Sequence, residues 1–331
     1  MSMHYHRDAL ADPREVARRV GRFWKEQLPA WIDLNLDVSP LLERGLAELA
    51  ATNLWGPANR EPSFTIWQEA GEILKHGWLQ RRAREKPRGY AGDHEMLGAI
   101  YQNRVTREPR GISFDEFFLR QAAPQSVRNR MDLVRNEVLR ATAPQKVVII
   151  GSGAGLEIAA ALQRSVPADR DEFWLLDLDP DAISLAEGNL QPFVPAENLH
   201  CLAENLVRLP KKRRLIENLQ DASLVVCTGF FDYLEDFQAT DLLTLFRQLL
   251  RPGGRALIFN FAPWNPTRAY MEWIGNWYLL YRTREDLARL ATQAGVAHSD
   301  FTISAEPSGI DLLLTLSNPK VDSGLQAPAA P

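Results

Sequence analysis

The feature that most constrains the fold is a change of pattern near Lys146. From there on, short apolar runs alternate with stretches of helical periodicity, which is typical of βαβ units and a mainly parallel sheet. We predict strands at 146–151, 172–178, 199–203, 223–229 and 255–261, followed by FTISAE and IDLLLTLS near the end. The last two runs leave no room for a helix between them, so they predict an antiparallel hairpin at one edge of the sheet.

The chain before this point is dominated by helical periodicity. Asp12 and Pro13 have the form of a capped helix start, and further helices are predicted from Ser39, over 64–84 and from near Ser126. The fold class is therefore α/β with an N-terminal helical addition. We predict three parts, which are a helical domain at 1–125, a sheet domain at 126–318 and a disordered tail at 319–331 that is rich in Pro, Ala and Gly.

The composition of the 331 residues is ordinary, with 45% hydrophobic residues and a formal net charge of −4. That charge gives no global attraction to nucleic acid or to an anionic membrane. No apolar run has the form of a signal peptide or the length of a membrane span, so the cytoplasm is the default location. Cys201 and Cys227 lie in apolar runs and are expected to be buried free thiols, and the scattered histidines predict no metal site. The oligomeric state is left open.

A glycine-rich turn follows the first predicted strand in the stretch VVIIGSGAGLE. Gly151, Gly153 and Gly155 allow a tight turn in which the backbone can approach a ligand near the N-terminus of the next helix. The second strand ends in LLDLDP, which places Asp177 and Asp179 where a carboxylate can accept the hydroxyls of a ribose. The combination predicts a nucleoside-binding site at the carboxyl ends of the first two strands.

Two cofactors compete for this arrangement. A dinucleotide site requires GxGxxG, but the sixth position here is Leu156. An S-adenosylmethionine site uses GxGxG, a carboxylate after strand two, and an acidic or amide side chain after strand three near the adenine. Glu204 and Asn205 stand at that third place. The sequence therefore favours S-adenosylmethionine.

The stretches DASLVVCTGFFDYLEDF and LLRPGGRALIFNF extend this pattern through strands four and five. Over roughly 125–318 the chain resembles class I S-adenosylmethionine-dependent methyltransferases, which implies a Rossmann-like sheet and S-adenosylmethionine as cofactor. One position departs from that family, which commonly has Asp or Glu two residues before the first glycine, where this chain has Ile149. Backbone carbonyls of the glycine turn or Asp232 could hold the methionine amino group instead.

A narrower resemblance lies in TGFFDYLED, FNFAPWNPTRAYMEW, WYLLYRT and PRGYAGD. These stretches resemble bacterial extracellular-factor 3-hydroxypalmitic acid methyl ester biosynthesis proteins, which implies methylation of a fatty-acyl carboxylate in secondary metabolism or signal synthesis. The methyltransferase-like body of the chain is also similar to that of azetidine-2-carboxylate synthases, in which the amino group of S-adenosylmethionine attacks its own γ-carbon and methylthioadenosine leaves. A third alternative is a regulator that binds S-adenosylmethionine without turnover.

Candidate pocket residues follow strands four and five, where ligands lie in open parallel sheets. A carboxylate acceptor is already ionised at neutral pH, whereas an amine must first lose a proton to a nearby group. We predict Asp232, Tyr233 and Asn260 as catalytic residues, Phe231 as a cofactor contact, and Tyr270, Trp277 and Tyr281 as parts of a substrate pocket. Trp273 and Tyr278 are further pocket candidates, and at least half of all these candidates are expected to be structural, because aromatic residues at helical spacing more often belong to a core.

The stretch KPRGYAGDHEML, residues 86–97, is a loop that leads into a helix capped by Asp93. Capping accounts for Asp93 but leaves Arg88 and Tyr90 unexplained. An N-terminal helical addition commonly covers the mouth of the cofactor cleft in this fold, so we predict Arg88, Tyr90 and Asp93 as lid residues, with Tyr90 catalytic. The basic runs at 81–88 and 208–214 are expected to be solvated helix ends and loops.

Overall fold

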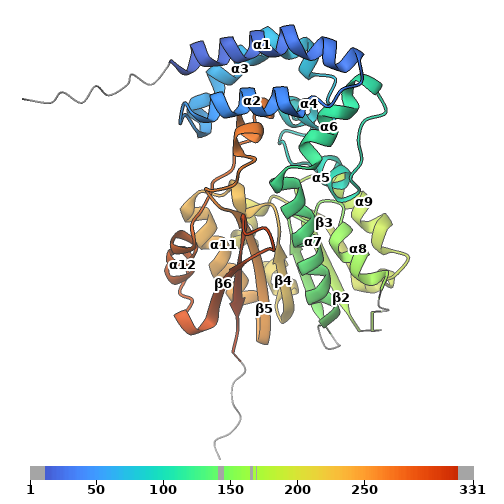
Figure 1. The fold of residues 1–331 in the computed structure, drawn as a ribbon. Helices are drawn as coiled ribbons and strands as arrows, with labels where there is room; N and C mark the ends of the chain where they lie inside the picture. The colour runs from blue at the N-terminus through green and yellow to red at the C-terminus, as the bar shows by residue number, and fades with distance from the viewer. Residues whose placement is uncertain (1–11, 141–144, 165–166, 169, 320–331) are drawn as a thin grey trace, which may run out of the picture. The chain divides into compact units, whose positions relative to one another are not determined.

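The computed structural model describes residues 12–140, 145–164, 167–168 and 170–319 (Figure 1). The chain divides into two compact units. The helical unit comprises Met1–Val127 and Asn265–Leu279, and the sheet unit comprises Arg128–Trp264 and Leu280–Pro331. Apart from its first residue, the tail predicted at 319–331 lies outside the described residues.

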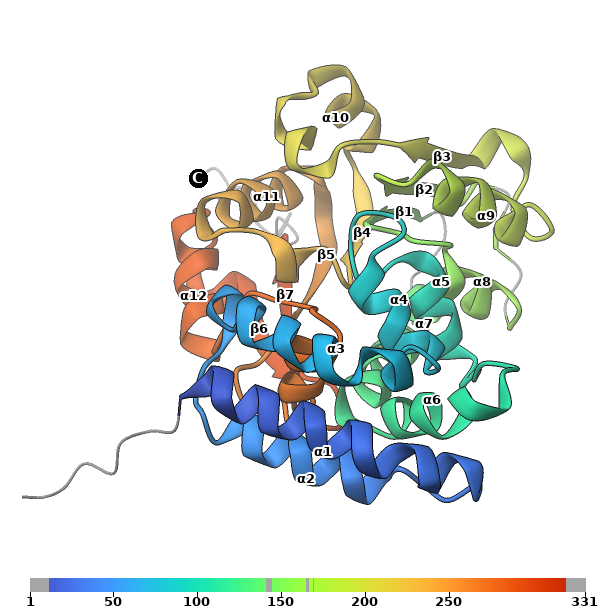
Figure 2. The same cartoon turned by 90° about the horizontal axis from the view of Figure 1, so that it is seen from above.

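The helical unit is built from helices that the sequence predicts in part. Its helices are α1 (Pro13–Asp33), α2 (Ser39–Ala50), α3 (Arg60–Leu74), α4 (Trp78–Glu85), α5 (His94–Tyr101) and α6 (Ile112–Leu119), with 3₁₀ turns at Gly56–Asn59 and Pro109–Gly111, the π-helical turn Tyr270–Ile274, and the start of α7 (Ala122–Arg140). The helix α1 starts as predicted, because the side chain of Asp12 accepts a hydrogen bond from the Arg14 N–H at 3.0 Å. It packs against α2 and α3 (Figures 1 and 2).

The single helix predicted over 64–84 is wrong. The chain forms α3 and α4 instead, and Gly77 precedes the first residue of α4. A Cβ atom at Gly77 would lie 2.7 Å from the Phe114 Cβ, so the close approach to α6 requires glycine there. The Asp115 carboxylate accepts a hydrogen bond from the Leu79 N–H at 2.9 Å, a first-turn N–H that has no acceptor within the helix, and so stabilises the new helix start. The apolar periodicity runs through the break, which is why it predicted one helix.

The sheet unit confirms the predicted α/β fold class. Its strands are β1 (Lys146–Ile150), β2 (Glu172–Asp177), β3 (Leu199–Ala203), β4 (Ala222–Cys227), β5 (Leu250–Phe261), β6 (Phe301–Ala305) and β7 (Asp311–Ser317). They form a sheet in the order β3-β2-β1-β4-β5-β7-β6 (Figure 2). The strands β1 to β5 are parallel, whereas β7 is antiparallel to β5 and β6. The predicted hairpin at one edge of the sheet is therefore confirmed.

Helices cover both faces of this sheet. They are α7, α8 (Leu156–Leu162), α9 (Pro180–Leu190), α10 (Arg213–Leu219), α11 (Asp236–Leu249) and α12 (Arg284–Gln293), with short 3₁₀ turns at Ala196–Asn198, Leu206–Lys211, Phe231–Tyr233 and His298–Asp300. Side chains alternate along β1, so Val147 and Ile149 pack toward α7, α8 and α9 while Val148 and Ile150 pack toward α10, α11 and α12 (Figure 2). Two apolar cores result, one on each face of the sheet.

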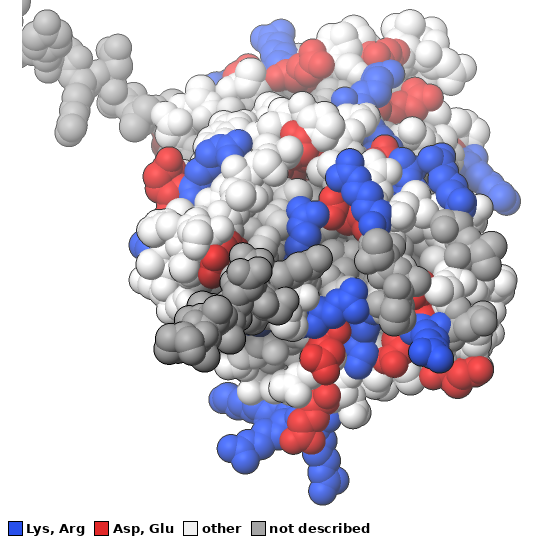
Figure 3. Space-filling model, turned by 90° about the horizontal axis from the view of Figure 1, so that it is seen from below, with Lys and Arg blue, Asp and Glu red and all other residues white. Residues whose placement is uncertain are grey.

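The surface carries charges of both signs. Basic and acidic side chains are intermixed on the face seen in Figure 3. Ion pairs of the sheet unit include Arg255 with Glu137 at 2.6 Å and Lys146 with Glu172 at 3.4 Å. Across the described ranges, none of the helices has both the length and the apolar composition that crossing a bilayer requires. Cys201 and Cys227 are free thiols, as predicted; Cys227 is buried as expected, whereas Cys201 is half-buried.

Candidate functional site

The glycine turn joins β1 to α8 and is held against the end of β2. The backbone N–H groups of Gly151 and Ser152 donate to the Leu176 carbonyl at 2.8 and 3.1 Å. Gly155 has a φ of +64°, and a Cβ atom there would lie 2.8 Å from Leu175 Cδ2 and 3.0 Å from Leu190 Cδ1. Any larger residue would be strained in conformation and would push α8 away from the sheet.

Asp177 connects this turn to the second strand. Its Oδ2 accepts the Gly153 N–H at 2.8 Å, and its Oδ1 accepts the Asp179 N–H at 3.0 Å. Burial raises the pKa of Asp177, while these two N–H groups lower it. A carboxylate offers about four acceptor positions, so Asp177 keeps acceptor capacity for a hydroxyl beside the backbone N–H groups of Gly153, Asp179 and Leu178. Asp177 therefore fixes the glycine turn and retains the capacity to bind a diol.

The neighbouring strand ends bring the other predicted cofactor residues to the same edge of the sheet. Asp179 caps α9, where its side chain accepts the Asp181 N–H at 3.0 Å. The Glu204 N–H donates to the Asp177 carbonyl at 2.7 Å, and the Glu204 carboxylate forms an ion pair with Lys212. The side chain of Asn205 accepts the Arg208 N–H at 3.3 Å. Residues predicted from three separate stretches thus lie after adjoining strands.

Asp232, after β4, and Asn260, in β5, bind the backbone at the end of β5. Asp232 is only 2% exposed, and its Oδ1 accepts the Phe261 N–H at 2.8 Å. The Asn260 Nδ2 donates to the carbonyls of Phe261 at 2.9 Å and Leu280 at 3.0 Å. Asp232 and Asn260, both predicted as catalytic, thus hold the backbone at Phe261, near the end of β5, and Asn260 also holds it at Leu280, where the chain returns to the sheet unit.

The two aromatic residues beside Asp232 have different surroundings. Phe231 is fully buried and belongs to the apolar core on the α11 face of the sheet, whereas Tyr233 is 36% exposed. A third aromatic residue, Tyr281, was predicted to line the substrate pocket; it lies in the sheet unit and is half-buried.

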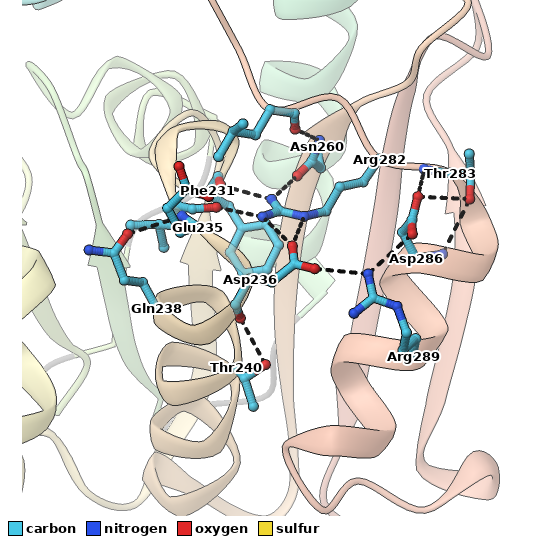
Figure 4. Close-up of polar contacts among 12 residues, drawn as sticks. Phe231, Glu235, Asp236, Gln238, Thr240, Asn260, Arg282, Thr283, Asp286 and Arg289 are labelled. Carbon is cyan, nitrogen blue, oxygen red and sulfur yellow. Dashed lines mark hydrogen bonds and ion pairs between the residues drawn. The ribbon is translucent and has the colours of Figure 1, made fainter.

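Arg282 connects these elements (Figure 4). It is 3% exposed, and its guanidinium donates to Asn260 Oδ1 at 2.8 Å and to the Phe231 carbonyl at 3.3 Å. It also donates to the Leu234 carbonyl and to Asp236 Oδ1, the latter at 3.1 Å. The second oxygen of Asp236 binds the exposed Arg289 at 2.9 Å. The ends of β4 and β5 are thereby fixed relative to each other.

Sequence reasoning missed a buried charge cluster formed by Arg130, Asp232, Asp311 and Arg282. Arg130 comes from α7, and its Nη1 donates to Asp311 Oδ2 at 3.1 Å. A Cβ atom at Gly229 would lie 3.2 Å from the Arg130 Nη2, so glycine makes room for the guanidinium after β4. Each of the four charged residues is at most 3% exposed. Because 181 positions separate Arg130 from Asp311, no local pattern could have paired them.

Burial sets the proton affinity of this cluster. It raises the pKa of Asp232 to about 7, although the Phe261 N–H and the charges of Arg130 and Arg282 lower it. It also raises the pKa of Asp311 well above its usual range; the Arg130 guanidinium opposes this shift, and the Asp232 carboxylate adds to it. Two carboxyl groups of raised proton affinity thus lie around one arginine, an arrangement that can accept a proton near neutral pH.

The helical unit contains the remaining predicted residues, and most are engaged within it. Asp93 caps α5 by accepting the Met96 N–H at 2.9 Å, and its carboxylate also binds Arg82 at 2.7 Å. Tyr270 is 3% exposed and donates its hydroxyl hydrogen to Gln80 Oε1 at 2.9 Å. Trp277 is 8% exposed. Arg88 lies 3.4 Å from Glu95, and Tyr90 is half-buried. Asp93 and Tyr270 thus have clear structural roles.

Comparison with known proteins identifies the fold. No protein-family model matches the chain, and no curated protein is similar to it in sequence. Among solved structures, one described as a possible exported protein from Bordetella parapertussis has a TM-score of 0.60 at 15% identity, covering 93% of this chain and 97% of that chain. The CurJ carbon methyltransferase has a TM-score of 0.50 at 12% identity, covering 93% and 91%. The Rossmann-like fold predicted for this chain is therefore confirmed.

Proposed function

We propose that this chain is an S-adenosylmethionine-dependent methyltransferase that acts on a small molecule. The observation that carries the proposal is the position of Asp177, a buried carboxylate that binds the glycine turn while keeping acceptor positions for a ribose. A glycine turn alone is common in αβ connections. Here the turn, the carboxylate and the pair Glu204 and Asn205 follow three neighbouring strands.

The residues fit the nucleoside half of S-adenosylmethionine. Asp177 would accept the ribose hydroxyls, Glu204 or Asn205 would bind the adenine, and the glycine turn would adjoin the methionine part. Ile149 is 4% exposed and packs in the core toward α7, so no side-chain carboxylate precedes the turn. Asp232 is then the candidate for binding the methionine amino group.

When bound, S-adenosylmethionine supplies a carbon activated by the adjacent sulfonium. The task of the chain is to align the acceptor with that carbon, which can account for several kcal/mol of the barrier. A fatty-acyl carboxylate, the acceptor implied by the sequence resemblance, is ionised at neutral pH and requires no base. We propose it as the acceptor, with Arg88 and Tyr90 as acceptor-binding residues and with the cytoplasm as the site of action.

A second candidate is the intramolecular cyclase, with S-adenosylmethionine as substrate. The substrate nitrogen would form a bond to the γ-carbon while the carbon–sulfur bond breaks, giving azetidine-2-carboxylate and methylthioadenosine. The ammonium must first lose a proton, so this reaction requires an acceptor. The buried Asp232, with its pKa raised to about 7 beside Arg130 and Asp311, favours this alternative.

Incubation of the pure protein with S-adenosylmethionine alone separates the candidates. Methylthioadenosine together with a cyclic amino acid would establish the cyclase and exclude the transferase. S-adenosylhomocysteine that forms only after addition of fatty acids would establish the transferase. Tight binding without turnover under both conditions would identify a regulator instead.

A further inference from the structure

Three basic side chains come together in the helical unit, and two of them, Arg60 and Arg84, lie near Tyr278. Arg60 is the first residue of α3, Arg84 lies in the last turn of α4, and Lys86 follows α4; we call these three residues the basic cluster. The Arg60 guanidinium lies 5.1 Å from the centroid of the Tyr278 ring, and that of Arg84 lies 4.9 Å from the Trp67 ring.

The charges of the basic cluster act on one another. Burial lowers the pKa of Arg84 to about 10. Burial also lowers the pKa of Lys86, and the positive charges of Arg60 and Arg84 lower it further. A lysine whose proton affinity falls because of two arginines lies close to both. The protein therefore holds three like charges near one another.

No carboxylate of the described residues forms an ion pair with the basic cluster. The Arg84 Nη1 donates to two neutral oxygens, Ser63 Oγ at 2.9 Å and the Ile274 carbonyl at 3.2 Å. Glu272, whose charge acts on Tyr278, is fully buried and already accepts from Arg268 at 2.7 Å, and from Gly56 and Asn59 at 2.6 and 2.9 Å.

Other basic residues of the same sequence run, 81–88, do have carboxylate partners. Within residues 81–88, Arg82 binds Asp93 at 2.7 Å and Arg88 lies 3.4 Å from Glu95. Arg84 and Lys86, from the same run, have no such partner among the described residues. A solvated helix end does not explain this difference, because Arg84 is mostly buried and packs on Trp67.

The local backbone gives a second reason to expect a ligand. Arg60 is placed at the N-terminus of α3, where the helix dipole disfavours a cation and favours an anion. Lys86 has a φ of +49° at the end of α4, a left-handed position that usually carries glycine or asparagine. At Arg60 the helix dipole opposes the positive charge, whereas at Lys86 the left-handed backbone is strained for a residue with a side chain.

We propose that the basic cluster binds an oxyanion, the carboxylate or phosphate group of the small-molecule acceptor. The planar guanidinium fork suits either group, and stacking on an aromatic ring leaves its in-plane N–H groups able to donate. The identification of the ligand as the acceptor rests on the proposed function, whereas the oxyanion site itself does not depend on it.

The test is a titration of the full chain with inorganic phosphate and, separately, with hexanoate, in the absence of S-adenosylmethionine. Sodium chloride keeps the ionic strength constant, because screening alone alters surface charge effects. Calorimetry and the thermal unfolding midpoint report binding. We expect one of the two anions to bind and to raise the midpoint beyond the effect of chloride, and the preferred anion shows which group the acceptor carries.

Two variants with matched controls locate the site. Lys86→Gln and Arg60→Gln should each weaken binding of the preferred anion about tenfold or more. Lys25→Gln and Arg18→Gln, at exposed positions of α1, should leave it unchanged. Lys86→Gln should also raise the unfolding midpoint without added anion, because it removes like-charge repulsion. Equal responses of wild type and Lys86→Gln, or no response beyond chloride, would overturn the proposal. Failure of S-adenosylmethionine to bind would overturn only the proposed function.

Discussion

Gly155 shows how a single residue fixes the site. It ends the glycine turn in a left-handed conformation and lies against Leu175 and Leu190. The positions of α8 and of the turn both depend on the absence of a side chain there.

We expect Gly155→Ala to lower the free energy of unfolding by about 2 kcal/mol, because an alanine would be strained in conformation and would meet both leucines. Gly188→Ala is the matched control, since Gly188 lies in α9 with open space around its Cα atom. It should raise the unfolding free energy by about 0.5–1 kcal/mol. Urea denaturation measures both. Equal effects would show that the contact with Leu175 is unimportant.

Asp232 makes the stability of the chain depend on pH. Its pKa is about 7 in the folded state and near 3.8 when exposed, so the folded state binds more protons between these values. The contribution of Asp232 to stability should therefore fall as pH rises from about 4 to 7, by up to about 4 kcal/mol. The groups that act on it are Arg130, Arg282 and Asp311.

Chemical denaturation at several pH values tests this expectation. In Asp232→Asn the fall in stability between pH 5 and pH 7.5 should be clearly smaller than in wild type, because the titrating group is gone. The same dependence on pH in both proteins would assign the titration to another residue.

At the scale of elements, Arg282 joins the ends of β4 and β5 through buried acceptors and reaches α11 through the exposed Asp236. We expect Arg282→Met to lower the free energy of unfolding by about 3–5 kcal/mol, since it leaves the side chain of Asn260 and the carbonyls of Phe231 and Leu234 without their donor. Arg289→Met removes the exposed partner of Asp236 and should cost less than about 1 kcal/mol. Thermal unfolding that ranks the two variants equally would contradict this role.

Most strands could be predicted because their signal is local. The runs at 146–151 and 199–203 are apolar, are bounded by polar residues, and match β1 and β3 within one residue. Long-range packing was invisible in the sequence. It breaks the helix predicted over 64–84 at Gly77, and it includes Asn265–Leu279 in the helical unit although this segment directly follows β5.

The same distinction applies to the site. The glycine turn and Asp177 lie at the carboxyl ends of predicted strands or just after them, so their place at one edge of the sheet could be foreseen. Arg130 could not, because one arginine in a helix carries no sign of a partner 181 positions away.

At the scale of the whole molecule, the helical unit is discontinuous in sequence. The Glu272 carboxylate accepts from Gly56 and Asn59, and Ser63 donates to the Trp273 carbonyl at 2.9 Å. Trp273 and Ile274 are fully buried. The segment Asn265–Leu279 therefore depends on residues at the other end of the chain.

A chain that lacks residues 1–127 should aggregate, because it would expose the apolar side chains of this segment. Replacement of Asn265–Leu279 in the same shortened chain by a glycine and serine linker of equal length should restore a soluble monomer. Size-exclusion chromatography measures the monomer fraction. Equal solubility of the two shortened chains would contradict the assignment of this segment to the helical unit.

Calorimetric titration with S-adenosylhomocysteine measures whether the ends of β1, β2 and β3 form a nucleoside site. The wild type should bind this ligand. Asp177→Ala should bind it about tenfold more weakly or worse, because the variant loses the acceptor for the ribose hydroxyls. Asp241→Ala, at an exposed position of α11, is the control and should bind like wild type. Asp177→Asn, which keeps the shape of the side chain, guards against a folding defect in the alanine variant. A wild type that does not bind, or Asp177 variants that are folded and bind equally well, would contradict the account.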